Sequence, residues 1–183
     1  MAGGALTFLI GGARTGKSTL AVQVGEHHGG AVHFIATAEP FDDDLRERVE
    51  RHRAERPLAW TTAEVPVELA GAIDGAPPDA FVIVDCLTVW LANLLIHVID
   101  PQRRAQYEHD TVAALRERAA TTSPVVVVSN EVGMGIHPDT PMGREYRDEL
   151  GRLNQLVAAA ADTSLLVVAG RALRLENAWD LLR

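Results

Sequence analysis

The stretch Leu6 to Thr19, LTFLIGGARTGKST, decides the fold of this 183-residue chain. An apolar run typical of a buried strand breaks into glycines, and a Lys-Ser-Thr then opens a helical pattern. The spacing Gly11-x-x-x-x-Gly16-Lys17-Ser18 is that of a phosphate-binding P-loop, which needs a strand before it and a helix after it. The stretch therefore predicts strand, phosphate loop and helix. The alternative is a glycine turn that merely joins a strand to a helix.

Each residue type in this loop has a chemical use. Glycines let backbone N–H groups converge on phosphate oxygens, and the positive end of the following helix dipole adds to the attraction. We expect Lys17 to reach the β- and γ-phosphates and the hydroxyl of Ser18 to bind Mg²⁺. The loop thus predicts a site for a nucleoside triphosphate.

Composition excludes several functional classes. Seventeen Lys and Arg stand against 25 Asp and Glu, a formal net charge of -8 without a basic stripe, so we expect no nucleic acid partner. A single cysteine rules out an intramolecular disulfide and is typical of a reducing compartment. The longest apolar stretch, residues 86–99, is too short and polar to span a bilayer, and no N-terminal signal pattern is visible. We expect one cytoplasmic domain, residues 1–183, with no membrane partner.

Strand and helix patterns alternate along the rest of the chain. Strands are predicted at residues 31–36, 60–63, 81–85, 125–129 and 165–169, the second of them at an edge. Helices are predicted after the loop and at residues 42–56, 67–73, 88–99, 101–120 and 140–161. The strands at 81–85 and 125–129 are apolar up to their last residue, which is typical of strands covered on both faces. The alternation predicts an α/β three-layer sandwich with a mostly parallel central sheet.

Two carboxylates follow predicted strands. Asp85 ends the run FVIVD, where a doubly wound sheet places ligands, so it is a candidate to orient Mg²⁺. The alternative is an aspartate that caps the following helix near Thr88. Glu131 follows the strand VVVVS and is either a general base for a substrate hydroxyl or a loop charge.

His52 raises the question of a second reaction. It continues the apolar row of Leu45 and Val49 and is therefore expected on the inner face of its helix. An imidazole with one neutral, free nitrogen is a good nucleophile toward phosphorus. Attack on the α-phosphate would expel pyrophosphate and leave a nucleotidyl-imidazole. A histidine in this position is more often a packing residue, and the spacing alone leaves both interpretations open.

The chain resembles the bifunctional adenosylcobinamide kinase and adenosylcobinamide-phosphate guanylyltransferase family of cobalamin biosynthesis. The matching segments are GGARTGKS (11–18), IATA (35–38), RVERHRAERP (48–57), the TAE that ends at Glu64, VDCLTVWLANLL (84–95), SNEVGMGIHP (129–138) and GRLNQLVAAAAD (151–162). The NEVGMGI segment and the histidine helix are far more specific than the P-loop. Residues 171–183 have no close match and carry no prediction.

The resemblance implies a RecA-like P-loop NTPase fold assembled as a homotrimer, with His52 and Lys17 as catalytic residues. It implies phosphorylation of the corrinoid adenosylcobinamide by GTP or ATP. GMP then passes from a guanylylated His52 to adenosylcobinamide phosphate, which gives adenosylcobinamide-GDP and pyrophosphate. Ser18 and Asp85 are the expected Mg²⁺ ligands. The implied nucleotide-binding positions are Gly11, Gly12, Ala13, Arg14, Thr15, Gly16, Lys17, Ser18, Ala36, Thr37, Ala38, Arg53, Ala54, Glu55, Arg56, Glu64 and Asp85.

Two rival functions keep the P-loop and discard the histidine. A monofunctional small-molecule kinase would use Glu131 or Asp85 as its base and would release a nucleoside diphosphate, never pyrophosphate. A nucleotide-dependent switch or assembly ATPase would hydrolyse nucleotide without any small-molecule acceptor.

Overall fold

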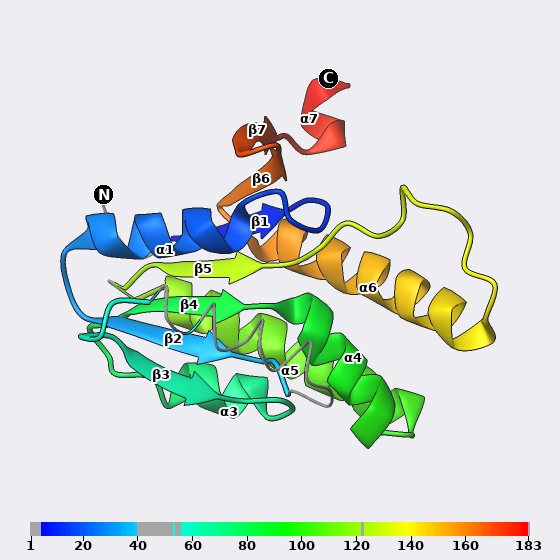
Figure 1. The fold of residues 1–183 in the computed structure, drawn as a ribbon, viewed down its shortest axis with the longest axis horizontal. Coiled ribbons are helices and arrows are strands. Elements are labelled where there is room, and N and C mark those ends of the chain that lie inside the picture. The colour runs from blue at the N-terminus through cyan, green and yellow to red at the C-terminus, as the bar shows by residue number, and fades with distance from the viewer. Residues whose placement is uncertain (1–4, 40–52, 54–55, 122, 183) are drawn as a thin grey trace.

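The computed structural model describes residues 5–39, 53, 56–121 and 123–182. Within these ranges one sheet has the strand order β3-β2-β4-β5-β1-β6-β7, and every neighbouring pair is parallel except the antiparallel pair β6 and β7 (Figure 1). The predicted mostly parallel sheet is confirmed. The strands are β1 (Leu6–Ile10), β2 (Val32–Ala36), β3 (Thr61–Glu64), β4 (Phe81–Asp85), β5 (Val125–Val128), β6 (Thr163–Val168) and β7 (Arg171–Leu175).

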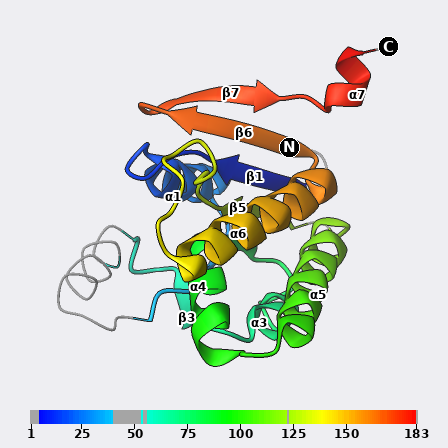
Figure 2. The same ribbon diagram turned by 90° about the vertical axis from the view of Figure 1, so that its right-hand side faces the viewer.

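Helices cover both faces of this sheet. Helix α1 packs on one face, and the four helices from α3 to α6 lie on the other, so the predicted three-layer arrangement is confirmed (Figure 2). The predicted helix at residues 42–56 lies almost entirely outside the described residues. None of the helices in the described ranges is both long and apolar enough to cross a membrane. The helices are α1 (Lys17–His28), α3 (Leu69–Asp74), α4 (Leu87–His97), α5 (Pro101–Ala119), α6 (Pro141–Ala160) and α7 (Ala178–Leu181).

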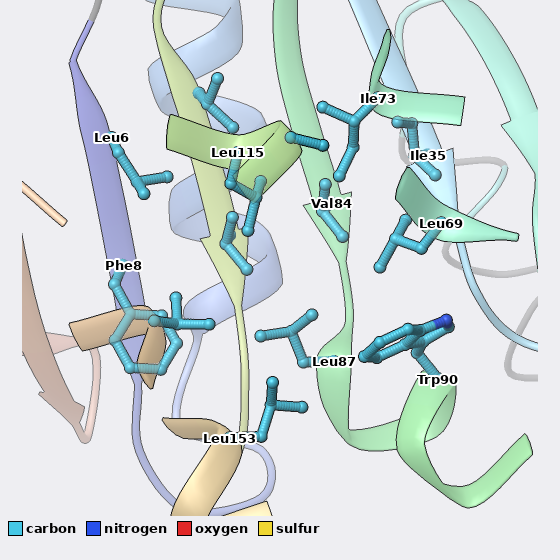
Figure 3. Packing of buried hydrophobic residues seen from close by; sticks show 14 of the residues in the cluster. Leu6, Phe8, Ile35, Leu69, Ile73, Val84, Leu87, Trp90, Leu115 and Leu153 are labelled. Atoms are coloured by element: carbon cyan, nitrogen blue, oxygen red, sulfur yellow. The ribbon is translucent and has the colours of Figure 1, made fainter. Parts of the chain in front are cut away.

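Alternate residues of the central strands supply two hydrophobic cores. In β1, Leu6 and Phe8 face the layer of four helices, whereas Leu9, next to Phe8, faces α1. Figure 3 shows the larger core, in which Trp90 of α4 and Leu115 of α5 approach the side chains of the strands. Because both faces are covered, each central strand is apolar at nearly every position, as the sequence predicts.

Local signals in the sequence fix several helix positions. The Asp100 side chain accepts a hydrogen bond from the Gln102 backbone N–H, 2.9 Å away, at the start of α5, and Thr140 caps α6 in the same way. Gly25 lets α1 approach the sheet closely, because a Cβ there would lie 2.8 Å from the ring of Trp60. Gly25 thus lets the C-terminal part of α1 lie close to the sheet.

The register of the strands brings the predicted site residues to one edge. Ala36 at the end of β2 pairs with Glu64 of β3 on one side and with Asp85 of β4 on the other. Asp85 in turn pairs with Val128 at the end of β5. Since parallel strands end level with one another, the carboxyl edge of the sheet faces the P-loop, where α/β folds bind their ligands.

The second strand of the C-terminal hairpin, β7, lies in the segment for which the sequence made no prediction. Strand β6 ends at Val168, and β7 returns antiparallel after the two turn residues Ala169 and Gly170, which have φ of 50° and 71°. Two left-handed residues between antiparallel strands are typical of a type I′ turn. Every residue of β7 is exposed, so the strand lacks the buried pattern that marks the others.

Candidate functional site: a phosphate-binding edge

The P-loop joins β1 to α1 at the carboxyl edge of the sheet. Gly11 has a φ of 157°, and a Cβ there would lie 2.2 Å from the carbonyl oxygen of Val167 in β6. A side chain is therefore excluded at this position. On the other side of the loop, the Gly170 backbone N–H donates to the Thr15 carbonyl oxygen, 2.9 Å away. The turn between β6 and the unpredicted strand β7 thus supports the phosphate loop.

Lys17 lies inside this loop and is only 6% exposed. Its Nζ donates to the carbonyl oxygens of Gly11 at 2.9 Å and Gly12 at 2.6 Å. Burial lowers the pKa of Lys17, while the negative charge of Asp85 acts in the opposite direction. The ammonium is therefore held where the phosphates of a nucleotide would lie, close to the carboxylate of Asp85.

Asp85 ends β4 next to the P-loop. The N-cap of α4 is Cys86, so the alternative in which Asp85 serves as the cap residue of that helix is not supported. Burial raises the pKa of the Cys86 thiol to about 11, with the charge of Asp85 adding to the effect, so this thiol is protonated at neutral pH. Asp85 is thus the ionisable oxygen donor at this strand end.

Ser18 and Asp85 suit Mg²⁺. Both offer oxygen, and Mg²⁺ is commonly bound by one or two protein oxygens together with substrate phosphates. Ser18 lies in the first turn of α1, directly after Lys17. Within the described residues no group of three or more His, Cys, Asp or Glu could hold a metal ion by itself. The donor set therefore fits a cation shared with a triphosphate better than a metal site formed by the protein alone.

Two arginines extend the positive side of this edge. The Arg56 guanidinium carbon lies 3.8 Å from the ring centroid of Phe34 in β2. Burial lowers the pKa of Arg56, and the charge of Asp85 counteracts this. Arg53 Nη1 lies 3.4 Å from Glu64 Oε1 at the end of β3, and both side chains are exposed. The planar guanidinium group of an arginine at this edge can donate paired hydrogen bonds to phosphate oxygens.

The last three residues of the IATA segment, at and after the end of β2, differ in their environments. Ala36 is buried, Ala38 is half-buried, and Thr37 is fully buried with its polar groups bonded to the protein. Of the three positions that the resemblance assigns to the nucleotide, Ala38 is the one whose surface reaches solvent most clearly.

Glu131 has a role in its own loop. Its backbone N–H donates to the carbonyl oxygen of Gly11 at 3.1 Å, which fastens the loop after β5 to the P-loop. One of its carboxylate oxygens, Oε1, accepts from the Gly133 N–H at 2.5 Å. The structure therefore supports the loop role for this oxygen, and the general-base role stays a prediction.

The structure brings together the predicted residues of the P-loop, the ends of β2, β3 and β4, and the two arginines. His52, Ala54 and Glu55 lie outside the described residues.

A buried polar network beside this edge was not predicted. Ser129 Oγ donates to Asn154 Oδ1 at 2.7 Å, and Asn154 Nδ2 donates to the Asn130 carbonyl at 3.0 Å. The Asn130 N–H donates to Thr88 Oγ1 at 2.8 Å. The signal in the sequence is the amide of Asn154, which is 6% exposed and lies on the otherwise apolar buried face of α6.

Comparison with known proteins extends this picture. Residues 7–175 match the family described as cobinamide kinase / cobinamide phosphate guanyltransferase. The chain is similar to the bifunctional adenosylcobalamin biosynthesis protein CobP of Pseudomonas aeruginosa, with 39% identity over 88% of this chain and 92% of that protein. It is also similar to CobU of Salmonella typhimurium, with 37% identity over 90% of this chain and 96% of that protein.

Solved structures with a similar fold are more distant in sequence. The flagellar accessory protein FlaH of Methanocaldococcus jannaschii matches with a TM-score of 0.55 and 13% identity, over 96% of this chain and 80% of that one. The RadB recombinase matches with a TM-score of 0.55 and 20% identity, over 90% of this chain and 74% of that one. At these identities the likeness shows the fold alone, that of the P-loop NTPases.

Proposed function

Because this chain belongs to the cobinamide kinase / cobinamide phosphate guanyltransferase family, we propose that its P-loop edge carries out both reactions at one nucleotide site, each with its own triphosphate. The chain is a kinase and a nucleotidyltransferase of adenosylcobalamin biosynthesis. The observation that carries the proposal is the meeting of Lys17, Asp85 and Arg56 at one edge, where the charge of Asp85 influences the pKa of both cations.

The kinase step transfers the γ-phosphoryl group of GTP or ATP to the aminopropanol hydroxyl of adenosylcobinamide. The hydroxyl oxygen forms a bond to the γ-phosphorus, the bond to the bridging β,γ-oxygen breaks, and the nucleoside diphosphate leaves with the extra negative charge. The hydroxyl proton passes to a general base, the role predicted for Glu131. Lys17 stabilises that charge from within the loop. Mg²⁺, held by Ser18 and Asp85, would neutralise phosphate oxygens when bound.

The transferase step uses His52 as the nucleophile. A ring nitrogen attacks the α-phosphorus of GTP, a P–N bond forms, and pyrophosphate leaves. A phosphate oxygen of adenosylcobinamide phosphate then attacks the same phosphorus and the P–N bond breaks, which gives adenosylcobinamide-GDP and returns the imidazole. Two in-line displacements invert the phosphorus twice, so its configuration is retained overall. Arg53 follows His52 in sequence and approaches Glu64, which supports a place for this segment beside the nucleotide edge.

The residues that we propose for the nucleotide fall into three groups. The P-loop supplies backbone N–H groups and Lys17, and Arg14, Arg53 and Arg56 supply further positive charge. The end of β2 and the residues after it supply Ala36 and Ala38, and the end of β3 supplies Glu64. Ala54 and Glu55 are included on the resemblance of their segment alone.

We also propose a homotrimer in the cytoplasm. The C-terminal hairpin and α7 expose several large apolar side chains, and β7 has an open edge, features typical of a surface covered by another protein copy. The single cysteine supports a reducing compartment.

Product analysis tests the proposal against its rivals. With GTP and adenosylcobinamide, we expect a nucleoside diphosphate first, and pyrophosphate beyond one equivalent per protein only after adenosylcobinamide phosphate has formed. Adenosylcobinamide phosphate supplied directly should release pyrophosphate alone. Release of nucleoside diphosphate without any pyrophosphate would indicate a monofunctional kinase. Nucleotide hydrolysis at a rate that no corrinoid changes would indicate a switch or assembly ATPase.

A further inference from the structure

Thr37, at the end of β2, bonds entirely within the protein. Its side chain is 0% exposed. Its Oγ1 donates to the Cys86 carbonyl oxygen at 2.7 Å and accepts from the Cys86 backbone N–H at 2.9 Å. The Thr37 backbone N–H donates to the carbonyl oxygen of Asp85 at 3.2 Å. Thr37 therefore hydrogen-bonds to the backbone N–H and C=O of Cys86 and to the carbonyl oxygen of Asp85.

Asn93 of α4 completes this arrangement. Its Nδ2 donates to the Thr37 carbonyl oxygen at 2.8 Å and to the Pro66 carbonyl oxygen at 3.1 Å, and the side chain is 4% exposed. The Val65 N–H donates to the carbonyl oxygen of Ala36, which brings the segment after β3 to the same place. The ends of β2, β3 and β4 are thus joined through Thr37.

We infer that Thr37 is a positioning residue, whose hydroxyl fixes the Asp85–Cys86 turn so that the Asp85 carboxylate faces the phosphate loop. This inference rests on the proposed function, because it takes Asp85 as the carboxylate at the nucleotide-bound cation. A hydroxyl has one hydrogen to donate, and that hydrogen is used on Cys86. Thr37 therefore acts on the nucleotide through Asp85 rather than by direct contact.

The hydroxyl, rather than the shape of the side chain, carries this role. Valine has nearly the same volume as threonine but neither donates nor accepts a hydrogen bond. At position 37 it would leave the Cys86 N–H without its present partner in a buried place, where unpaired polar groups are unfavourable, and the Cys86 C=O would keep only the Trp90 N–H as donor. The turn would relax toward other partners, and the carboxylate of Asp85 would move with it.

Three variants separate the hydroxyl from packing. Thr37→Val removes the hydroxyl, and Thr37→Ser keeps it while removing a methyl group. Thr111→Val is the matched control, because Thr111 of α5 is also 0% exposed and its Oγ1 has no hydrogen-bond partner among the described residues. If Thr37→Val does not fold, as judged by circular dichroism, Thr37→Cys replaces it, with activity expected below that of Thr37→Ser.

Two measurements give the outcome. In protein free of metal and nucleotide, exchange of the Cys86 amide hydrogen should be faster in Thr37→Val and close to wild type in Thr37→Ser. In the reaction, Thr37→Val should lower kcat and raise the Mg²⁺ concentration for half-maximal rate by about tenfold or more, with a smaller change in KM for GTP. Thr111→Val should change none of these quantities. A Mg²⁺ requirement in Thr37→Val equal to that of wild type would overturn the inference.

Asp85→Asn distinguishes failure here from failure of the proposed function. If Asp85→Asn abolishes activity while Thr37→Val leaves the Mg²⁺ requirement unchanged, only the role of Thr37 is wrong. If Asp85→Asn keeps the wild-type rate and Mg²⁺ requirement, the role proposed for Asp85 is wrong as well.

Discussion

At the scale of single residues, Lys17 combines the clearest sequence signal with the most constrained environment. It is the only lysine of the chain, and its ammonium lies inside the loop against two backbone carbonyl oxygens. A bound triphosphate offers that ammonium phosphate oxygens in place of these carbonyl groups. Both proposed reactions require a triphosphate bound in this loop, so both depend on this residue.

We therefore predict that Lys17→Met lowers the kinase and guanylylation rates by about 100-fold or more, because the positive charge within the loop is lost. Rates measured with labelled GTP check this. Amine-directed acylation offers an independent test, since GTP should protect the only lysine of the wild-type chain. Guanylylation of Lys17→Met at the full rate would mean that the nucleotide binds outside the loop.

Glu108 of α5 is a buried carboxyl group outside the site. It is 2% exposed, and its Oε1 has no hydrogen-bond partner among the described residues. Burial raises its pKa, an effect that the Arg152, His109 and Arg104 charges oppose and the Glu149 charge reinforces. The folded protein therefore holds this proton more tightly than the unfolded chain. The resulting stabilisation is complete below the ordinary glutamate pKa and is lost as pH rises through the raised pKa.

Glu108→Gln should consequently stabilise the protein at pH 8, and the difference should vanish near pH 4, close to the ordinary glutamate pKa of about 4.3. Melting temperatures of wild type and variant at pH 4, 6 and 8 check the prediction. The exposed Glu117 provides the control Glu117→Gln, which should show no such trend. A difference that is constant with pH would contradict the assignment of a raised pKa.

At this scale the sequence predicted residues whose chemistry is carried by a motif. Lys17 and Asp85 lie where the P-loop spacing and the strand end placed them. The buried bonding of Thr37 could not be predicted, because it depends on Cys86 and Asn93, which are distant in sequence and become neighbours only in the folded sheet.

At the scale of elements, the turn between β6 and β7 is the feature with the clearest energetic consequence. Ala169 has a φ of 50°, a left-handed conformation that alanine adopts at a cost. Asn-Gly is the preferred pair for a type I′ turn, and Gly170 already occupies the second position.

Ala169→Asn should therefore stabilise the protein by up to about 1 kcal/mol, measured as the free energy of unfolding in urea. The nucleotide affinity should be retained, because the Gly170 N–H that supports Thr15 is unchanged. Destabilisation by this variant would indicate a different turn conformation in solution.

The contrast between the central strands and the hairpin explains what could be predicted for the elements. Strands β4 and β5 are apolar at nearly every position because helices cover both faces, so their sequences identify them. Strand β7 is exposed along its length, and its pairing is set by a turn and by contact with β6. Neither feature produces a pattern of hydrophobicity within the strand itself.

At the scale of the whole molecule, the C-terminal hairpin and α7 carry an apolar surface that the described part of the chain does not cover. Leu173 is 65% exposed and Trp179 is 72% exposed. The same hairpin contacts the P-loop through Gly170. If copies of the chain assemble on this surface, the assembly lies close to the nucleotide site.

Trp179→Glu should dissociate the proposed homotrimer into monomers, because a charge would be buried at the interface. Sedimentation velocity of the purified protein measures this directly. Ile99→Glu is the control, since Ile99 is 87% exposed at the end of α4 and should leave the trimer intact. A wild-type protein that sediments as a monomer would contradict the trimer, and a trimeric Trp179→Glu protein would place its interface elsewhere.

The central claim is that a triphosphate in the P-loop is attacked at its α-phosphorus by His52. The most direct measurement is incubation with GTP labelled at the α-phosphate, followed by detection of label bound to the protein. The wild-type protein should carry a GMP adduct that is labile to acid and stable to base, as expected of a P–N bond. The control His109→Ala, at an exposed position of α5, should label equally, and His52→Ala should not label at all. A labelled His52→Ala protein would contradict the account.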